Sequence, residues 1–197
     1  TGKLVCCGYT GIYEYDVDAD TLTGITSIHD TTGVCMLENG NIYILPRYNY
    51  RPTYIYNPVT KTATQAMQLP SSAEDMACMG CALTSLGKIV LAPYYSTYIY
   101  TFDPTTNSYA TGPAHFETTP AFAGAIRAPN GKIIFIPQYS THIGIYDPVA
   151  NTYTAGPTHD GGFYGGCLMP NGKILLVPRG TSYVGIYDPV ENTYTRG

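Results

Sequence analysis

The segment PNGKILLVPRGTSYVGIYDPVENTYT (residues 170–195) follows the segment PNGKIIFIPQYSTHIGIYDPVANTYT (residues 129–154), and the two agree at 16 of 26 positions. Both ends of the segment are nearly identical, and most of the differences fall in the middle. Internal similarity at a fixed spacing is typical of folds that are built from repeated units. The rest of the 197-residue chain carries the same unit in a less regular form.

Five glycines mark equivalent points of this unit, at spacings of 38, 47, 44 and 41 residues: Gly2, Gly40, Gly87, Gly131 and Gly172. A period of about 43 residues is typical of the blades of a β-propeller. At three of these points the glycine follows an asparagine, and Asn-Gly is the favoured pair for a tight hairpin turn. An apolar run such as Ile133–Ile136 comes next and predicts a buried strand.

A second turn follows an aromatic residue and an Asp or Asn, at Tyr15-Asp16, Tyr56-Asn57, Phe102-Asp103, Tyr146-Asp147 and Tyr187-Asp188. Proline comes next in four of the five units, and Asx followed by Pro favours a chain reversal.

A further strand is predicted before each of the last four of the five glycines that mark the unit. It carries a glycine seven residues upstream of each of them: Gly33, Gly80, Gly124 and Gly165. Glycine suits strands that converge on a crowded axis. A complete unit therefore predicts a meander of four antiparallel strands.

This pattern resembles the kelch repeat, a four-stranded propeller blade, in its inner-strand glycines, NGKI hairpin, Tyr-Asp-Pro corner and aromatic outer strand. It departs from that repeat where Pro137-Gln138 and equivalent pairs replace a double glycine, and where Tyr replaces the outer Trp. The resemblance implies an all-β fold, a β-propeller of five repeats. The style of the repeats also resembles that of surface and tail proteins of large DNA viruses and bacteriophages.

We place a single domain over residues 1–197, with blades at approximately 1–28, 29–69, 70–113, 114–157 and 158–197. The first blade lacks its inner strand, because Gly2 opens directly on the second strand. We expect that the chain is part of a larger propeller, or that blade one has an exposed edge or is completed by another segment or a partner.

Composition argues against two classes of partner. The formal net charge is -4 and the ten Lys and Arg residues are scattered, which does not favour nucleic acid. No apolar stretch is long enough for a membrane span.

The six cysteines include one CMGC motif, Cys78 to Cys81, without a second pair for zinc. We expect all six to pack in the core as small apolar residues, and the protein to fold in a reducing compartment.

The candidate binding residues lie on one face. Hairpins and corners fall on one side of a propeller, and the loops after the second strand fall on the other side with the loops between blades. The loops on this second side vary from repeat to repeat, and variable loops on a rigid scaffold often carry recognition. We predict a ligand or partner site at Arg47, Tyr48, Tyr50, Tyr94, Tyr95, Gln138, Tyr139, His142 and Arg179. The alternative is that these tyrosines only pad neighbouring blades.

Histidines recur at matched places in the loops between blades, at His29, His115 and His159. Imidazole can bind a metal, but adjacent blades diverge outwards and the second repeat has Leu69-Pro70 there. We therefore expect loop-capping hydrogen bonds from these histidines, with no metal and no cofactor.

The sequence carries no nucleophile elbow, zinc-protease helix or phosphate-binding glycine loop. We expect a non-catalytic propeller that acts in binding or structure, at a virion or extracellular surface. Its role would be that of a capsid or tail structural protein or a host-attachment protein. Its partners would be protein neighbours in an assembly, including a possible homo-oligomer, or a surface glycan. The alternatives are a cytoplasmic kelch-like adaptor for protein partners and a carbohydrate-active enzyme with paired carboxylates across blades.

Overall fold

The computed structural model describes residues 3–8, 10–26, 28–69 and 78–197, and these residues form β-strands joined by turns and loops. In this part of the chain no helix is long and apolar enough to cross a membrane. The strands are β1 (Lys3–Gly8), β2 (Gly11–Asp16), β3 (Thr21–Thr26), β4 (Thr31–Met36), β5 (Ile42–Pro46), β6 (Pro52–Asn57), β7 (Thr62–Gln68), β8 (Cys78–Leu83), β9 (Ile89–Pro93), β10 (Tyr98–Asp103), β11 (Ser108–Ala114), β12 (Phe122–Arg127), β13 (Ile133–Pro137), β14 (His142–Asp147), β15 (Thr152–Thr158), β16 (Gly162–Leu168), β17 (Ile174–Arg179), β18 (Gly185–Asp188) and β19 (Thr193–Arg196).

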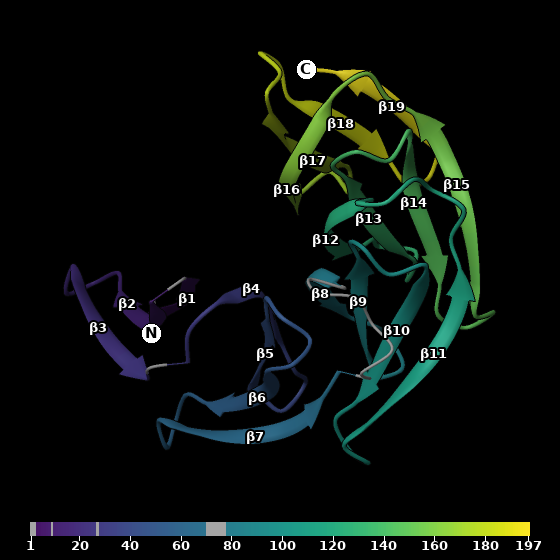
Figure 1. Ribbon diagram of the computed structural model, residues 1–197. Coiled ribbons are helices and arrows are strands. Elements are labelled where there is room, and N and C mark those ends of the chain that lie inside the picture. The colour runs from purple at the N-terminus through teal and green to yellow at the C-terminus, as the bar shows by residue number, and fades with distance from the viewer. Residues whose placement is uncertain (1–2, 9, 27, 70–77) are drawn as a thin grey trace.

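The strands form five antiparallel sheets in chain order, and the sheets stand as blades around a common axis (Figure 1). Four blades have four strands, with β4, β8, β12 and β16 innermost, and the first blade has the three strands β1–β3. The predicted fold class, a propeller of five repeats in which the first lacks its inner strand, is confirmed. The first and last blades lie at the two ends of an arc, and no described strand joins them into one sheet.

The two predicted turns have the expected chemistry. Gly131 has a φ of +83°, in the left-handed region that an Asn-Gly hairpin requires. At the corner of the same blade, Asp147 Oδ1 accepts hydrogen bonds from the backbone N–H of Val149 at 2.9 Å and of Ala150 at 3.0 Å. The equivalent Asx residues of the other four blades accept the same pair of bonds. The corner turn thus recurs in all five blades.

The inner strands approach one another closely at the axis. A Cβ atom on Gly33 in β4 would lie 2.6 Å from Cα of Gly80 in β8, and a Cβ on Gly80 would lie 2.8 Å from Cα of Gly124 in β12. No real side chain tolerates such contacts with backbone. Glycine is therefore required at these points by the proximity of the next blade, as the sequence pattern predicted.

The core lies between consecutive blades rather than inside a single one. Val90 and Ala92 of β9 pack with Ile133 and Phe135 of β13, and all four are fully buried. Burial of an aliphatic or aromatic side chain contributes about 1.5–3 kcal/mol. Because each blade is a thin sheet, it depends on its neighbours for most of this stabilisation.

The expectation that all six cysteines are core residues is wrong for two of them. Cys78 and Cys81 are buried and Cys35 is half-buried, but Cys6 and Cys167 are exposed. Cys6 lies in the first blade and Cys167 in the last, where a neighbouring blade is missing on one side. Cys7 belongs to β1, and its side chain is outside the described part of the structure.

Candidate ligand-binding site

Two kinds of loop meet on one face of the propeller: the loops between the second and third strands of a blade, and the loops between blades. His115 Nε2 lies 2.7 Å from the carbonyl oxygen of Ser96, and His159 Nε2 lies 2.9 Å from that of Ser140. Burial lowers the pKa of both histidines, so the neutral rings donate to these carbonyls. The predicted loop-capping role of these two histidines is confirmed. We call this side of the molecule the variable face.

Two half-exposed tyrosines and one arginine lie together on this face. Cζ of Arg179, at the end of β17, is 4.9 Å from the ring centroid of Tyr139 and 5.3 Å from that of Tyr164 in β16. The exposed fractions of Tyr139 and Tyr164 are 52% and 50%. A guanidinium over an exposed ring contributes about 0.5–1 kcal/mol, which restrains both rings while their open surface faces solvent.

Gln138 and two tyrosines of the third blade lie near these rings. Gln138 is 4% exposed, and its Nε2 donates to Tyr94 Oη at 3.4 Å. The rings of Tyr94 and Tyr95 meet edge to face with 4.8 Å between centroids. Gln138 Oε1 is buried and has no hydrogen-bond partner among the described residues. An unpaired buried acceptor costs about 1–3 kcal/mol, so Gln138 Oε1 gains a partner only if the side chains that cover it move apart.

The six residues Tyr94, Tyr95, Gln138, Tyr139, Tyr164 and Arg179 form what we call the tyrosine-arginine cluster. The Arg179 guanidinium holds the pKa of Tyr139 below its ordinary value, and burial raises the pKa of Tyr94. None of the ion pairs between described residues involves Arg179. The cluster therefore offers flat aromatic surface and one positive charge, beside a buried carbonyl oxygen that has no partner among the described residues.

Three of the predicted residues form a separate group in the second blade. The rings of Tyr48 and Tyr50 stack with 5.3 Å between centroids, and Cζ of Arg47 lies 5.6 Å from the Tyr48 ring centroid. Beside them, Arg51 forms an ion pair with Asp30 at 3.1 Å. A pocket of about 300 Å³ opens next to this group, lined by Ile28, His29, Pro46, Arg51, Pro52, Tyr54 and Ala63.

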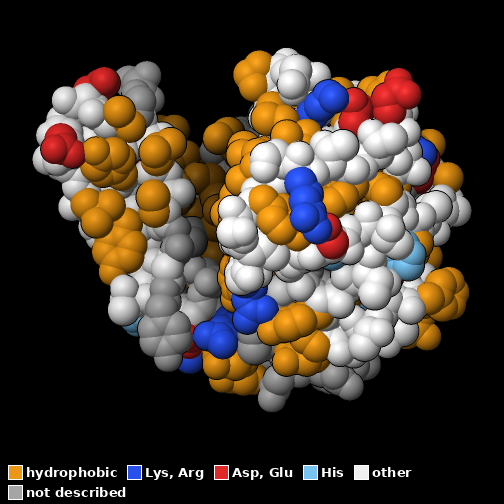
Figure 2. Space-filling model, turned by 90° about the horizontal axis from the view of Figure 1, so that it is seen from above, with side chains coloured by type: hydrophobic (Ala, Val, Ile, Leu, Met, Phe, Trp, Pro, Cys, Tyr) orange, Lys and Arg blue, Asp and Glu red, His pale blue; other side chains and the backbone are white. Residues whose placement is uncertain are grey.

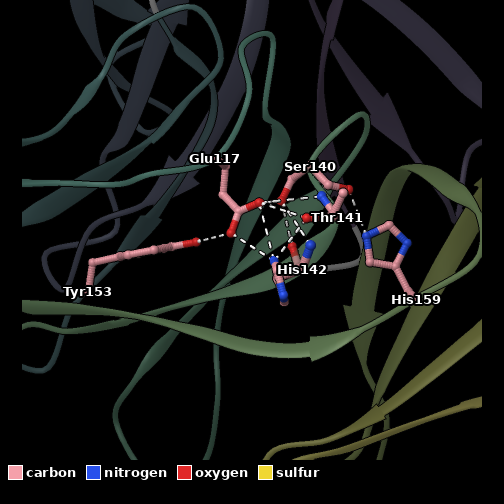
Figure 3. Close-up of polar contacts among 6 residues, drawn as sticks. All are labelled: Glu117, Ser140, Thr141, His142, Tyr153 and His159. Carbon is pink, nitrogen blue, oxygen red and sulfur yellow. Dashed lines mark hydrogen bonds and ion pairs between the residues drawn. The ribbon is translucent and has the colours of Figure 1, made fainter.

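His142 lies in a third group, which is centred on a carboxylate (Figure 3). Its Nδ1 is 3.2 Å from Glu117 Oε1, and Glu117 also accepts hydrogen bonds from Ser140 Oγ at 2.8 Å and Tyr153 Oη at 3.2 Å. Burial acts to raise the pKa of Glu117, but these hydrogen bonds hold it below its ordinary value. A carboxylate with so many donors is suited to fixing loops and poorly suited to accepting a proton.

The structure therefore brings five of the nine predicted residues into one cluster and leaves Arg47, Tyr48, Tyr50 and His142 outside it. Sequence reasoning missed Tyr164 and Glu117. Tyr164 precedes the inner-strand Gly165, where the other repeats have Thr32, Met79 and Ala123, so a large ring at this repeat position was the available signal. Within the described residues, no group of three or more His, Cys, Asp and Glu side chains could hold a metal ion.

No protein-family model matches this sequence, and no curated protein matches it. Similar solved structures exist. Virginiamycin B lyase from Staphylococcus aureus has a TM-score of 0.76 at 11% identity, over 100% of this chain and 70% of that one. An auxiliary nutrient binding protein from Bacteroides ovatus has a TM-score of 0.76 at 15% identity, over 98% of this chain and 53% of that one.

A protein of unknown function from Bacteroides thetaiotaomicron has a TM-score of 0.79 at 11% identity, over 98% of this chain and 54% of that one. The chain thus spans between about half and seven tenths of the length of these proteins. At such low identity the likeness shows the fold and leaves the kelch-like form of the repeat a prediction. By its strand order and by these neighbours, the chain is a β-propeller with five blades.

Proposed function

We propose that the protein is a non-catalytic binding module whose tyrosine-arginine cluster binds a carbohydrate. One observation carries the proposal: the half-exposed rings of Tyr139 and Tyr164 are restrained by Arg179, and Gln138, the neighbour of Tyr139 in the chain, has an unpaired carbonyl oxygen. Sugars present C–H faces that cover an aromatic ring and hydroxyls that donate to a fixed acceptor. A site with aromatic walls and a few oriented polar groups suits such a ligand.

The setting of this module is part of the proposal. We propose a glycan on a host or cell surface as the ligand, and a virion or other extracellular surface as the location of the protein. The repeat style supports the virion, and the auxiliary nutrient binding protein of similar fold is compatible with a binding role. A cytoplasmic adaptor would instead bind a protein with the same exposed rings.

A non-catalytic role is supported by Glu117, the buried carboxylate beside His142. Its oxygens are occupied by Ser140, Thr141 and Tyr153, and its pKa is lowered, so it is a weak base held in place. General acid or base catalysis near neutral pH requires a carboxyl with a raised pKa. The lyase among the structural neighbours shares the fold at 11% identity, and a shared fold does not imply a shared activity.

Glycan-array binding tests the proposal. Tyr139→Ala removes a ring of the cluster, and we expect it to weaken binding about tenfold or more, since stacking one aromatic ring contributes on the order of 1–2 kcal/mol. Tyr98→Ala is the matched control, because Tyr98 is 48% exposed and lies outside the cluster. We expect this control to bind as the wild type does. Equal loss in both variants, or no glycan bound by folded wild-type protein, would contradict a carbohydrate site at the cluster.

A further inference from the structure

A group of aromatic rings recurs between neighbouring blades near the variable face. In the fourth blade the ring centroids of Phe122 and Tyr153 lie 6.3 Å apart, and the ring of His115 contacts both. The fifth blade has the same arrangement with 6.1 Å between its two carbocyclic rings: Phe163, Tyr194 and His159. Two rings and one histidine thus fill this place in both blades.

The second blade has only one carbocyclic ring at the same place. By the strand register, Ala63 of β7 is the equivalent of Tyr153. Thr31 of β4 is likewise the equivalent of Phe122. Tyr54 of β6 supplies one ring, at a position where the fourth blade has a glycine. The second blade therefore lacks one ring that the fourth and fifth blades have.

The pocket of about 300 Å³ lies at the place of the missing ring, because Ala63, Tyr54 and His29 all line it. Ala63 is exposed, whereas Tyr153 is half-buried. An apolar cavity of about 150 Å³ can hold a benzene molecule. This pocket therefore has room for one aromatic ring.

This side of the second blade faces the first blade. Tyr54 and Tyr56 pack in one cluster with Ile12 of β2. Thr31 is half-buried there, whereas its equivalent Phe122 is fully buried. Figure 2 shows a hollow between the first blade, at the left, and the rest of the molecule, with hydrophobic side chains beside it. The contact between the first two blades is therefore less closely packed here than the contact between the third and fourth.

A polar contact also recurs at the end of the ring. Tyr153 Oη donates to Glu117 Oε1 at 3.2 Å, and the fifth blade has the same contact between its tyrosine and an aspartate at 3.1 Å. Both acids lie in the loop that leads into their own blade. In the second blade the acid of that loop is Asp30, whose Oδ2 lies 3.1 Å from Nη2 of Arg51. Arg51 lines the pocket, so the ion pair lies at its wall.

We propose that this pocket binds one phenol ring, which takes the place of the missing tyrosine, with its hydroxyl at the Arg51–Asp30 ion pair. Ile28, Pro46 and Pro52 supply further apolar surface for the ring. The pocket shares no residue with the tyrosine-arginine cluster, so this site is independent of the carbohydrate proposal. A small free phenol and the side chain of a tyrosine in another polypeptide both offer such a ring.

Titration with p-cresol tests the pocket. We expect saturable binding of one p-cresol per chain, followed by nuclear magnetic resonance, and no binding to Ala63→Tyr, whose own ring fills the space. Thr64→Tyr is the matched control, because Thr64 is exposed and neighbouring residues of a strand point to opposite faces. This control should bind p-cresol as the wild type does. Equal binding to Ala63→Tyr and the wild type, or no binding to the wild type, would overturn the proposal.

A second variant makes the result independent of whether Ala63→Tyr folds. Ala63→Leu introduces the residue that the first blade has at this position, Leu22. We expect p-cresol to bind this variant about tenfold or more weakly, because the larger side chain takes part of the space. An unchanged affinity would show that p-cresol binds elsewhere and would contradict the proposed site.

Toluene tests the role of the hydroxyl. It has the ring and the methyl group of p-cresol without the hydroxyl, so it cannot form a hydrogen bond with the Arg51–Asp30 pair. We expect toluene to bind about tenfold or more weakly than p-cresol, since hydrogen bonds to charged groups are among the stronger ones. Toluene binding as tight as that of p-cresol would overturn the assignment of a phenol.

N-acetyl-tyrosine amide separates the two sources of the ring. It carries the same phenol on a peptide backbone. If it binds to the wild type and not to Ala63→Tyr, the pocket accepts a tyrosine of another polypeptide. If p-cresol alone binds in this way, the pocket accepts a small free phenol. Failure of both probes to bind the folded wild-type protein would overturn the proposal.

Discussion

Glu117 illustrates how a single side chain can hold the variable face together. It lies in the loop before β12, accepts hydrogen bonds from Ser140 and Thr141 in the next loop, and accepts another from Tyr153 of the outer strand β15. In the last blade the exposed Asp160 accepts from Tyr183 and Tyr194 and pairs with Arg196. In both blades an acidic side chain connects a loop between blades to the outer strand.

This arrangement predicts an acid-dependent loss of stability. The pKa of Glu117 is lower in the folded protein than its ordinary value of 4.5, so folded Glu117 binds a proton less readily than unfolded Glu117. Its contribution is therefore complete above pH 4.5 and is lost as pH falls through the folded pKa. We expect the free energy of unfolding of Glu117→Gln to fall less steeply with acid than that of the wild type, measured by urea unfolding from about pH 6 to 3.

Glu191→Gln is the control for this prediction, because Glu191 is exposed in a corner turn. Its variant should follow the wild-type curve. If Glu117→Gln followed that curve as well, the carboxylate would not be coupled to folding through its hydrogen bonds.

Single residues were predictable from the sequence to the extent that the repeat constrains them. The corner aspartates and the capping histidines recur at matched positions, and their hydrogen bonds follow from local geometry. Glu117 and Tyr164 occur once, and their partners come from distant parts of the chain. Which side chains converge across blades depends on the tilt of neighbouring sheets, and a single repeat carries no information about that.

At the scale of elements, the inner strands show how a neighbour imposes a residue type. Gly33 and Gly165 occupy the same position in their blades, but their surroundings differ. A Cβ on Gly33 would lie 2.6 Å from the Gly80 backbone, whereas a Cβ on Gly165 would have nothing within 4 Å. The glycine pattern was readable from the sequence, but the sequence did not distinguish the glycine that the packing requires from the one that it does not.

The two positions therefore predict opposite outcomes for the same substitution. We expect Gly33→Ala to lower the free energy of unfolding by about 2 kcal/mol or more, because backbone of β4 and β8 must separate to admit the methyl group. Gly165→Ala should change it by about 0.5 kcal/mol or less, as an unobstructed substitution does. Chemical denaturation of both variants measures the difference. Equal destabilisation would mean that the inner strands do not press on one another at the axis.

At the scale of the whole molecule, the blades form an arc (Figure 1), and each blade contacts the next. Stability in such an array is a sum of blade terms and nearest-neighbour interfaces. The number of blades, their order and the missing inner strand were predictable from the period of the glycines. The exposure of Cys6 and Cys167 was not predictable from this period, because a repeat pattern assigns equivalent residues the same burial. The first and last blades each lack a neighbouring blade on one side.

The arc predicts unequal protection of the blades against hydrogen exchange. We expect amides of β2 in the first blade to exchange about tenfold or more faster than those of β13, whose blade packs between two others. Exchange followed by mass spectrometry at residue ranges 10–16 and 133–137 measures this ratio. Equal protection in both ranges would show that the five blades open as a single cooperative unit.

The repetition of one interface along the arc also bears on how such a chain can change over evolutionary time. Each blade has apolar residues equivalent to Val90 on one side and apolar residues equivalent to Ile133 on the other. A duplicated blade can therefore pack against its neighbours through the same contacts. A gene can therefore lengthen or shorten the protein by whole blades without inventing a new contact. The 16 identical positions of residues 129–154 and 170–195 are what such a duplication would leave. The loop in the middle of each segment does not contribute to this interface and can diverge.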